Sequence, residues 1–344
     1  MSLTMQDIIA KVGKGEKTSK DLTYQEAAAA MRLLLEKHAT PVQVGAFLLA
    51  MRIKSESVAE LAALASAARG YVEPLPIPSA LGVVDIPTYA GKQDAWHALL
   101  PAAIIAAAAG AHLLLHGYGG VPGRRSTAGI AAALSIPVDL TPDDAAREVT
   151  EKGFGYLDIA LYHPPIHGFL ELRKELGVRT FFQPVARLMN PARASVSIIG
   201  ISHPPYFEKI AEALRMMGSP RALILRGVEG EPELSISSIT KAIELRDDRI
   251  TPLTIHPKDV GMLPGRIDAS APNNLVEEAA LLRKLLANEL KGAGKDWVIM
   301  NAAAILYTAG KAASIRAAVP LALETLESGG AKKKLAQLAQ TPCS

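Results

Sequence analysis

The chain contains 344 residues, of which 49% are hydrophobic and 21% are charged, and its formal net charge is +3. This composition is typical of folded globular proteins and excludes a disordered chain, while the weak positive charge is compatible with an enzyme for anionic substrates and with a nucleic-acid-binding protein. The single cysteine, Cys343, excludes an intrachain disulfide and a cysteine-rich zinc site, so we expect a reducing, cytoplasmic environment.

Residues 5–70 are expected to be helical. Thr23 and Glu26 have the spacing of a capping box before an alanine- and leucine-rich run, Ser57 is placed to cap a later helix, and Gly70 is placed to end it. The N-terminal segment lacks the basic stretch and apolar core of a secretory signal. Three prolines within residues 74–78 predict an extended connector to a second unit.

After residue 80, short apolar runs alternate with helical patterns. The strand candidates are Gly82–Ile86, His112–His116, Val196–Ile201, Arg221–Arg226 and Leu253–Ile255. The helix candidates are Leu99–Ala109, Ser126–Leu134, Tyr206–Met217 and Leu275–Leu290. The most apolar stretch, residues 99–115, is too short for a membrane span, so we expect no membrane association. The alternation predicts an α/β domain with a mainly parallel central sheet covered by helices, which binds ligands at the carboxyl ends of its strands.

Two loops that follow predicted strands are candidates for binding phosphate or another polyanion. The first contains Gly91 and Lys92, whose backbone N–H groups and ammonium suit an anion, although the same residues also suit an ordinary surface turn. The second is rich in glycine and opens a predicted helix; the alternative is a mobile loop with solvated arginines. Its candidate residues are His116, Gly117, Arg124, Arg125, Ser126 and Thr127.

A third segment contains two histidines and several cations. His163 and His167 are four residues apart, but the intervening prolines are expected to break the helix that a zinc site would need. Arg173 and Arg179 are better candidates, because a guanidinium grips a carboxylate or phosphate with two parallel hydrogen bonds; exposed helix arginines are the alternative.

Acidic residues after the strand at 221–226 are candidates for a magnesium site. Glu229 and Glu233 lie at the expected strand end, where carboxylates hold magnesium that also bridges substrate phosphates. A solvated acidic turn is the alternative. The sequence shows no arrangement of serine, histidine and acid, and no cysteine nucleophile, so covalent catalysis has no support.

Several segments in chain order resemble the anthranilate phosphoribosyltransferases. They are Gln43–Lys54, Glu175–Phe182, Asn190–Pro191 and Asn301–Lys311. The resemblance implies a helical domain at 1–73, a hinge at about 163–190, an α/β domain formed by 80–160 and 191–344, and a homodimer through the helical domain. It also implies magnesium, phosphoribosyl pyrophosphate and anthranilate as ligands, with Arg173 at the position that holds the anthranilate carboxylate and Arg179 also matching.

The loops that bind phosphoribosyl pyrophosphate in that family are altered. The family's Gly-Thr-Gly-Gly-Asp aligns with Thr88–Lys92, where only Gly91 is kept, and its Lys-His-Gly-Asn-Arg aligns with Leu115–Gly119. Its acidic metal-binding pair falls on Pro232 and Glu233. A tyrosine at position 89 is expected to fill space meant for pyrophosphate.

The altered loops resemble a divergent, nucleic-acid-binding branch of the same family. The leading hypothesis is therefore a protein with little or no phosphoribosyl transfer that binds DNA or RNA through a basic groove. The second hypothesis is an active, magnesium-dependent anthranilate phosphoribosyltransferase of tryptophan biosynthesis, and the third is a pyrimidine-nucleoside phosphorylase-like enzyme. The residues available for a basic groove are Arg52, Lys54, Lys92, Arg124, Arg125, Arg173, Lys174, Arg179 and Arg187.

Overall fold

The computed structural model describes residues 3–15, 18–89, 91–93, 95–119, 121–227, 232–267 and 272–339. Glu229 and Cys343 lie outside these residues. No helix in the described ranges is long and apolar enough to cross a membrane.

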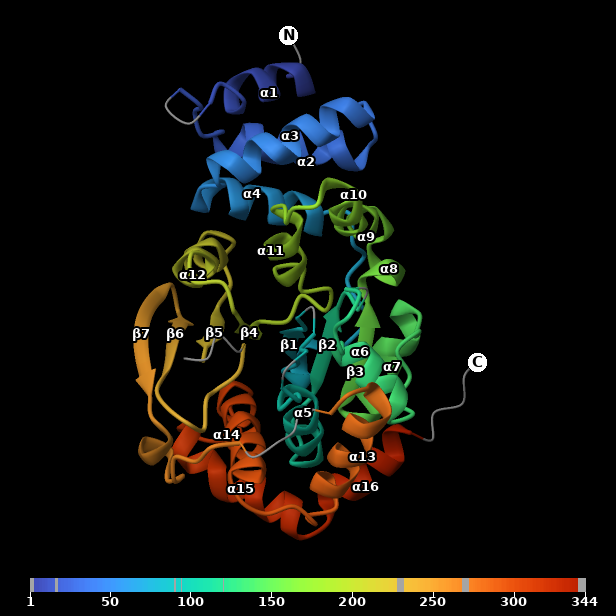
Figure 1. The fold of residues 1–344 in the computed structure, drawn as a ribbon, viewed down its shortest axis with the longest axis vertical. Coiled ribbons are helices and arrows are strands. Elements are labelled where there is room, and N and C mark those ends of the chain that lie inside the picture. Colours follow the sequence, from blue (N-terminus) through green and yellow to red (C-terminus); the bar gives the residue numbers. More distant parts are fainter. Residues whose placement is uncertain are drawn as a thin grey trace.

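The first unit of the chain is a bundle of four helices, which lies at one end of the molecule (Figure 1). The helices are α1 (Met5–Val12), α2 (Tyr24–Leu35), α3 (Pro41–Lys54) and α4 (Val58–Arg69). Each begins with a reciprocal capping box, in which a serine or threonine side chain accepts from the third backbone N–H of the helix. The predicted caps at Thr23 and Ser57 are confirmed, and Gly70 ends α4 as expected.

The second unit contains a seven-stranded sheet with the order β3-β2-β1-β4-β5-β6-β7. Strands β1 to β5 are parallel, whereas β6 and β7 are antiparallel additions at one edge, so the prediction of a mainly parallel α/β domain is confirmed. The strands are β1 (Val84–Pro87), β2 (Leu113–Gly117), β3 (Phe154–Asp158), β4 (Val196–Gly200), β5 (Arg221–Arg226), β6 (Thr240–Arg246) and β7 (Arg249–Ile255). Strands β3 and β6 were not predicted from the sequence, and only the end of β7 was.

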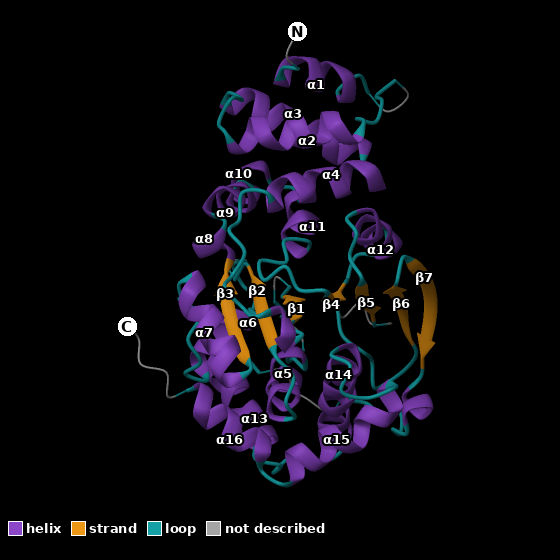
Figure 2. Cartoon of the chain, turned by 180° about the vertical axis from the view of Figure 1, so that it is seen from behind, coloured by secondary structure: helices purple, strands orange, loops and turns teal. Residues whose placement is uncertain are grey.

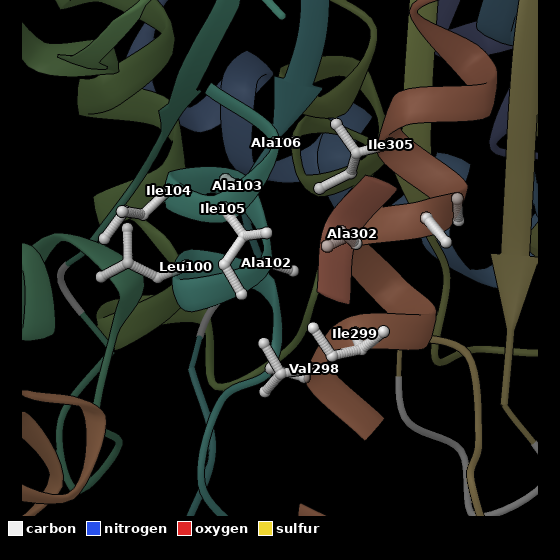
Figure 3. Close-up of a cluster of buried hydrophobic side chains, with 14 of the residues drawn as sticks. Leu100, Ala102, Ala103, Ile104, Ile105, Ala106, Val298, Ile299, Ala302 and Ile305 are labelled. Atoms are coloured by element: carbon white, nitrogen blue, oxygen red, sulfur yellow. The ribbon is translucent and has the colours of Figure 1, made fainter. Parts of the chain in front are cut away.

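Helices cover both faces of the sheet, as the alternating pattern predicts (Figure 2). On one face α5 (Leu99–Ala108) packs against α14 (Ala293–Thr308), and the side chains between them are small or branched, such as Ala102, Ala302 and Ile305 (Figure 3). Alanines allow the two helix backbones to approach closely. The same core includes α6 (Thr127–Ala133), α13 (Leu275–Leu286), α15 (Ile315–Glu327) and α16 (Gly330–Leu338).

A second core joins the opposite face of the sheet to the helical bundle. It includes α7 (Pro142–Lys152) and α12 (Tyr206–Met216) together with buried residues from the bundle. Two single-turn helices, η1 (Ser79–Leu81) and η2 (Pro257–Val260), complete the α/β unit.

Four short helices lie between the bundle and the sheet (Figure 1). They are α8 (Ile159–Tyr162), α9 (Pro164–Glu171), α10 (Arg173–Leu176) and α11 (Phe182–Arg187). The helix is broken here as expected, because α8 ends at Tyr162 and His163 has a non-helical backbone; Pro164 and Pro165 then occupy the first turn of α9, where a missing N–H costs nothing. His163 caps this helix, is buried, and contacts the backbone carbonyl of Ala68.

Candidate functional site

The loop after β1 is closed by a buried ion pair. The Lys92 ammonium donates to Glu233 Oε2 at 2.7 Å and to the carbonyl of Trp96 at 3.1 Å, and it lies 4.6 Å from the ring centre of Trp297. Lys92 is 6% exposed and Glu233 is 1% exposed. Lys92 therefore points inward to its own protein's carboxylate. An external anion could bind Lys92 only if this pair separated. Anion binding by Gly91 and Lys92 stays a prediction.

The other oxygen of Glu233 occupies the N-terminus of α5. Glu233 Oε1 accepts from the backbone N–H of Ala98 at 3.1 Å and of Leu99 at 2.9 Å, and from the Tyr89 hydroxyl at 2.7 Å. The first N–H groups of a helix have no partner within the helix and form a natural anion site. In this chain an internal carboxylate fills that site.

The space at the carboxyl ends of β1, β4 and β5 is correspondingly small. The cavity lined there by Tyr89, Pro232 and Glu233, among others, has a volume of about 10 Å³. A cavity of that size is no larger than a single water molecule requires. The predicted filling of this region by the tyrosine at position 89 agrees with its buried position and its bond to Glu233.

The second candidate loop is also held by a buried carboxylate. Arg125 Nε donates to Glu278 Oε2 at 2.6 Å, while Glu278 Oε1 lies 2.7 Å from both the backbone nitrogen and the Nδ1 of His97. Burial alone would raise the pKa of Glu278, but the contacts with His97 and Arg125 outweigh it and lower the pKa below its ordinary value. The remaining Arg125 nitrogens donate to the carbonyls of Gln93 and Ala95, so Arg125 fastens one loop to the other.

The two loops are joined through their backbones as well. Lys92 and Arg125 exchange a pair of N–H to carbonyl bonds of 3.0 and 2.9 Å. Gly91, which has a φ of +92°, makes this approach sterically feasible, because an added Cβ would lie 2.3 Å from the Arg125 carbonyl oxygen. Arg124 donates to the Gly91 carbonyl at 3.1 Å.

The other residues predicted in the second loop have local structural contacts. Ser126 is the N-cap of α6 and accepts from the N–H of Gly129, and Thr127 is buried in the first turn. His116 is fully buried between Asp85 at 3.0 Å and the Tyr162 hydroxyl at 2.9 Å. Gly117 has no room for a side chain, since a Cβ would lie 2.1 Å from the Thr88 hydroxyl. Phosphate binding by these residues stays a prediction.

The residues present do not fit a magnesium ion in this structure. Both oxygens of Glu233 are already used, one of them by an ammonium group that a divalent cation would have to displace. Within the part of the chain that the structure describes, no group of three or more histidine, cysteine or acidic residues could hold a metal.

A pocket that contains predicted residues lies instead between the helical bundle and the α/β unit. Its volume is about 430 Å³, within the range of small-molecule sites. It brings together Arg173 and Arg179, both predicted, with Arg52 from α3 and Arg187 from α11. The other residues that line it are Gly177, Val178, Thr180, Gln183, Pro184, Ile201, Ser202, His203 and Tyr206. No acidic side chain is among these residues.

The guanidinium groups of this pocket affect one another. Burial, and then repulsion from Arg173, Arg124 and Arg52, lowers the pKa of Arg179. Burial and repulsion from Arg179 lower the pKa of Arg187 to about 10, against a weaker opposing effect of Tyr89. Such mutual repulsion is relieved when an anion binds, so the pocket is electrostatically prepared for a negatively charged ligand.

Not every predicted cation belongs to this pocket. The Lys54 ammonium is paired with Asp21 at 2.6 Å and Glu60 at 2.7 Å inside the helical bundle. A second, smaller cavity of about 240 Å³ adjoins the pocket, because Arg173 and Gln183 line both. Lys174 lines only this second cavity and is paired with Glu171.

The residues that close the loops were not predicted from the sequence in this role. Glu278 and His97 carry no local motif, and Glu233 was predicted only as a metal ligand. Contacts over 141 or 181 residues have no signature in spacing. His203 and Tyr206 follow β4 at the carboxyl edge of the sheet, where ligand-binding residues of a parallel sheet are expected.

Comparison with known proteins gives the family. Residues 6–71 match the helical bundle domain, and residues 92–332 the a/b domain, of a glycosyl transferase family. The anthranilate phosphoribosyltransferase of Nitrosomonas europaea is 33% identical over 321 residues, covering 93% of this chain and 94% of that protein. That of Azorhizobium caulinodans is 32% identical, covering 97% and 95%.

Solved structures agree with this result. The anthranilate phosphoribosyltransferase of Thermus thermophilus superimposes with a TM-score of 0.86 at 31% identity, covering 97% of this chain and 98% of that one. The Saccharomyces cerevisiae enzyme, solved in complex with PRPP and Mg, shares the fold with a TM-score of 0.83 at 19% identity, covering 97% and 96%. The chain therefore belongs to the anthranilate phosphoribosyltransferase family of glycosyl transferases.

Proposed function

We propose that the pocket between the two units binds an aromatic acid of the anthranilate class, and that this acid is the acceptor in phosphoribosyl transfer. The observation that carries the proposal is the convergence of Arg173 and Arg179 on a 430 Å³ pocket without acidic lining residues. Relatives named for this activity cover nearly the whole chain.

In the proposed reaction the amine of the acid attacks C1 of phosphoribosyl pyrophosphate. A C–N bond forms, the bond from C1 to the pyrophosphate oxygen breaks, and the amine releases a proton. The contribution of this chain is positioning: Arg173 and Arg179 hold the carboxylate in a forked, charge-assisted geometry that fixes the direction of the amine. The donor side is less prepared, because Glu233 occupies the N-terminus of α5. Slow turnover is therefore expected.

Calorimetric titration with anthranilate, together with an assay of anthranilate consumption in the presence of phosphoribosyl pyrophosphate and magnesium, tests the proposal. Arg173→Ala removes charge-assisted hydrogen bonds worth roughly 1.5–3 kcal/mol, so the affinity is expected to fall by about 10- to 100-fold. Arg316→Ala, an exposed arginine on α15, is the matched control and leaves the affinity unchanged. Failure of the wild-type protein to bind anthranilate at millimolar concentration, without turnover, refutes the proposal.

A second candidate function is the binding of DNA or RNA by the same cationic surface. It is favoured by the partial exposure of Arg52, Arg173 and Arg179 and by the repulsion that links Arg124 to Arg179. Oligonucleotide binding is expected to weaken with salt, with a log–log slope of about −0.7 for each phosphate contacted in a single strand. Absence of binding at low salt eliminates this candidate.

We also propose that the helical bundle forms a homodimer, as the family resemblance implies. Helix α3 exposes Val42, Leu49 and Ile53, with exposed fractions of 81%, 48% and 66%. These residues are spaced by seven and four positions and therefore lie on one face of the helix. Light scattering after size exclusion is expected to report a dimer that Ile53→Lys dissociates. A monomeric wild-type protein contradicts this arrangement.

A further inference from the structure

The pocket at the carboxyl ends of the central strands is the most unusual part of the molecule, because the protein fills it with its own charged group. Donors of three kinds, all within residues 89–99, converge on one carboxylate from a distant segment: the Lys92 ammonium, the Tyr89 hydroxyl and the first N–H groups of α5. This is the donor set that anionic ligands use at a helix N-terminus beside a lysine. Here all of it is used by Glu233.

We propose that Glu233 is a specificity-determining residue that weakens the binding of phosphate-bearing ligands at the strand ends by acting as an internal substitute for their negative charge. The Lys92 ammonium and the N-terminus of α5 both donate to this carboxylate. An incoming phosphate must displace it, and the displaced carboxylate repels that phosphate. The obstruction is steric as well as electrostatic, because only about 10 Å³ remains beside Glu233.

The backbone supports this placement. Glycine at position 200, the last residue of β4, lets the chain around Pro232 lie against the strand end, since an added Cβ would be 2.1 Å from the Pro232 carbonyl oxygen. The side chain of Asn301 on α14 holds the next residue, donating to the Leu234 carbonyl at 3.1 Å and accepting from its N–H at 2.9 Å. Glu233 is thus fixed from both sides of its own segment.

The inference concerns the strand-end site and is independent of ligand binding in the arginine-lined pocket. Its test uses inorganic pyrophosphate as the probe, with binding measured by calorimetry and by the shift in Tm. The wild-type protein is expected to bind pyrophosphate weakly. Glu233→Ala removes the internal anion, leaves Lys92 and the α5 N-terminus available, and is expected to bind pyrophosphate at least about tenfold more tightly.

Two further variants establish the cause. Glu244→Ala is the matched control, because Glu244 also contacts a tyrosine, Tyr307, at 2.8 Å and a cation, Arg221, at 3.3 Å, but lies at β6. It is expected to gain no pyrophosphate affinity. Adding Lys92→Met to Glu233→Ala is expected to abolish the gain. If Glu233→Ala does not fold, Glu233→Gln, which keeps the shape and removes the charge, is expected to show a smaller gain of the same sign.

Clear outcomes overturn the inference. They are tight pyrophosphate binding by the wild-type protein, an equal gain in Glu244→Ala, or no gain in folded Glu233→Ala and Glu233→Gln. Anthranilate titration of the same variants separates this result from the proposed function. The arginine-lined pocket is intact in these variants. If the proposed acceptor site is wrong, no variant binds anthranilate. If the proposed role of Glu233 is wrong, only the pyrophosphate affinities differ from those expected.

Discussion

The buried network around Glu278 offers a quantitative test of how the two loops are held. Glu278→Ala removes the carboxylate that contacts Arg125 at 2.6 Å and His97 at 2.7 Å, while the Arg125 guanidinium keeps its two carbonyl acceptors but loses its counter-ion. Removing one partner of a buried ion pair typically destabilises a protein by about 3–5 kcal/mol. With a urea m-value of about 2–3 kcal/mol/M, the unfolding midpoint is expected to fall by about 1–2.5 M.

The sequence provides a convenient probe for this measurement. Its two tryptophans, Trp96 and Trp297, are 3% and 2% exposed and pack edge-to-face 4.9 Å apart in the α/β unit, next to Lys92. Intrinsic fluorescence therefore reports the unfolding of this region and not of the helical bundle. The control is Glu277→Ala, one residue earlier on the exposed face of α13. If Glu278→Ala loses no more stability than Glu277→Ala, the network does not hold the loops as described.

Three other predictions follow from the pKa shifts and the core. The pKa of Glu278 is lowered in the folded protein, so its stabilising effect is complete above its unfolded pKa of about 4.3 and is lost as pH falls through the folded pKa. The stability difference between wild type and Glu278→Gln should therefore shrink below about pH 4. An unchanged difference contradicts the shift. Burial and repulsion from Arg179 and Arg52 lower the pKa of His203, so its side chain is neutral near pH 7 and gains a positive charge only in more acidic solution. Because that charge attracts a carboxylate, anthranilate binding should strengthen as pH falls below about 6. The effect should be absent in His203→Gln and retained in His38→Gln. Ile305→Ala, in the α5–α14 contact of Figure 3, should cost about 2–5 kcal/mol in urea unfolding, and a loss below about 1 kcal/mol would show that the helices collapse onto the vacated space.

Local signals in the sequence predicted the parts of the fold that local interactions determine. The capping boxes at Thr23 and Ser57 were visible because the cap and its partner are three residues apart. Strand β3 was missed because it includes Gly155, which is unfavourable in a strand. Strand β6 was missed because its exposed positions are Lys241 and Arg246, which interrupt the apolar pattern. Pro164 and Pro165 correctly predicted a break in the helix at His163, and they also begin the next helix, because proline fits the first helical turn.

The candidate site also contains residues that local sequence predicts and contacts that it does not. Arg173 and Arg179 lie close together in the sequence, and the structure places both in one pocket. Lys92 and Arg125 look identical, in sequence, to phosphate-binding cations in a glycine-containing loop. Their buried partners come from distant segments, and only tertiary structure shows that the positive charges are already neutralised.

The joined loops also constrain how such a sequence can change over time. Replacing Lys92 by the family's aspartate would place two carboxylates in one buried site, and replacing Glu233 first would leave a buried ammonium without a partner. Either single step is expected to be unfavourable, so the route between this loop and the phosphate-binding form runs through coupled substitutions. A change made at one position of the first loop thus selects for changes far away in the chain, and lineages that have crossed this barrier are slow to return.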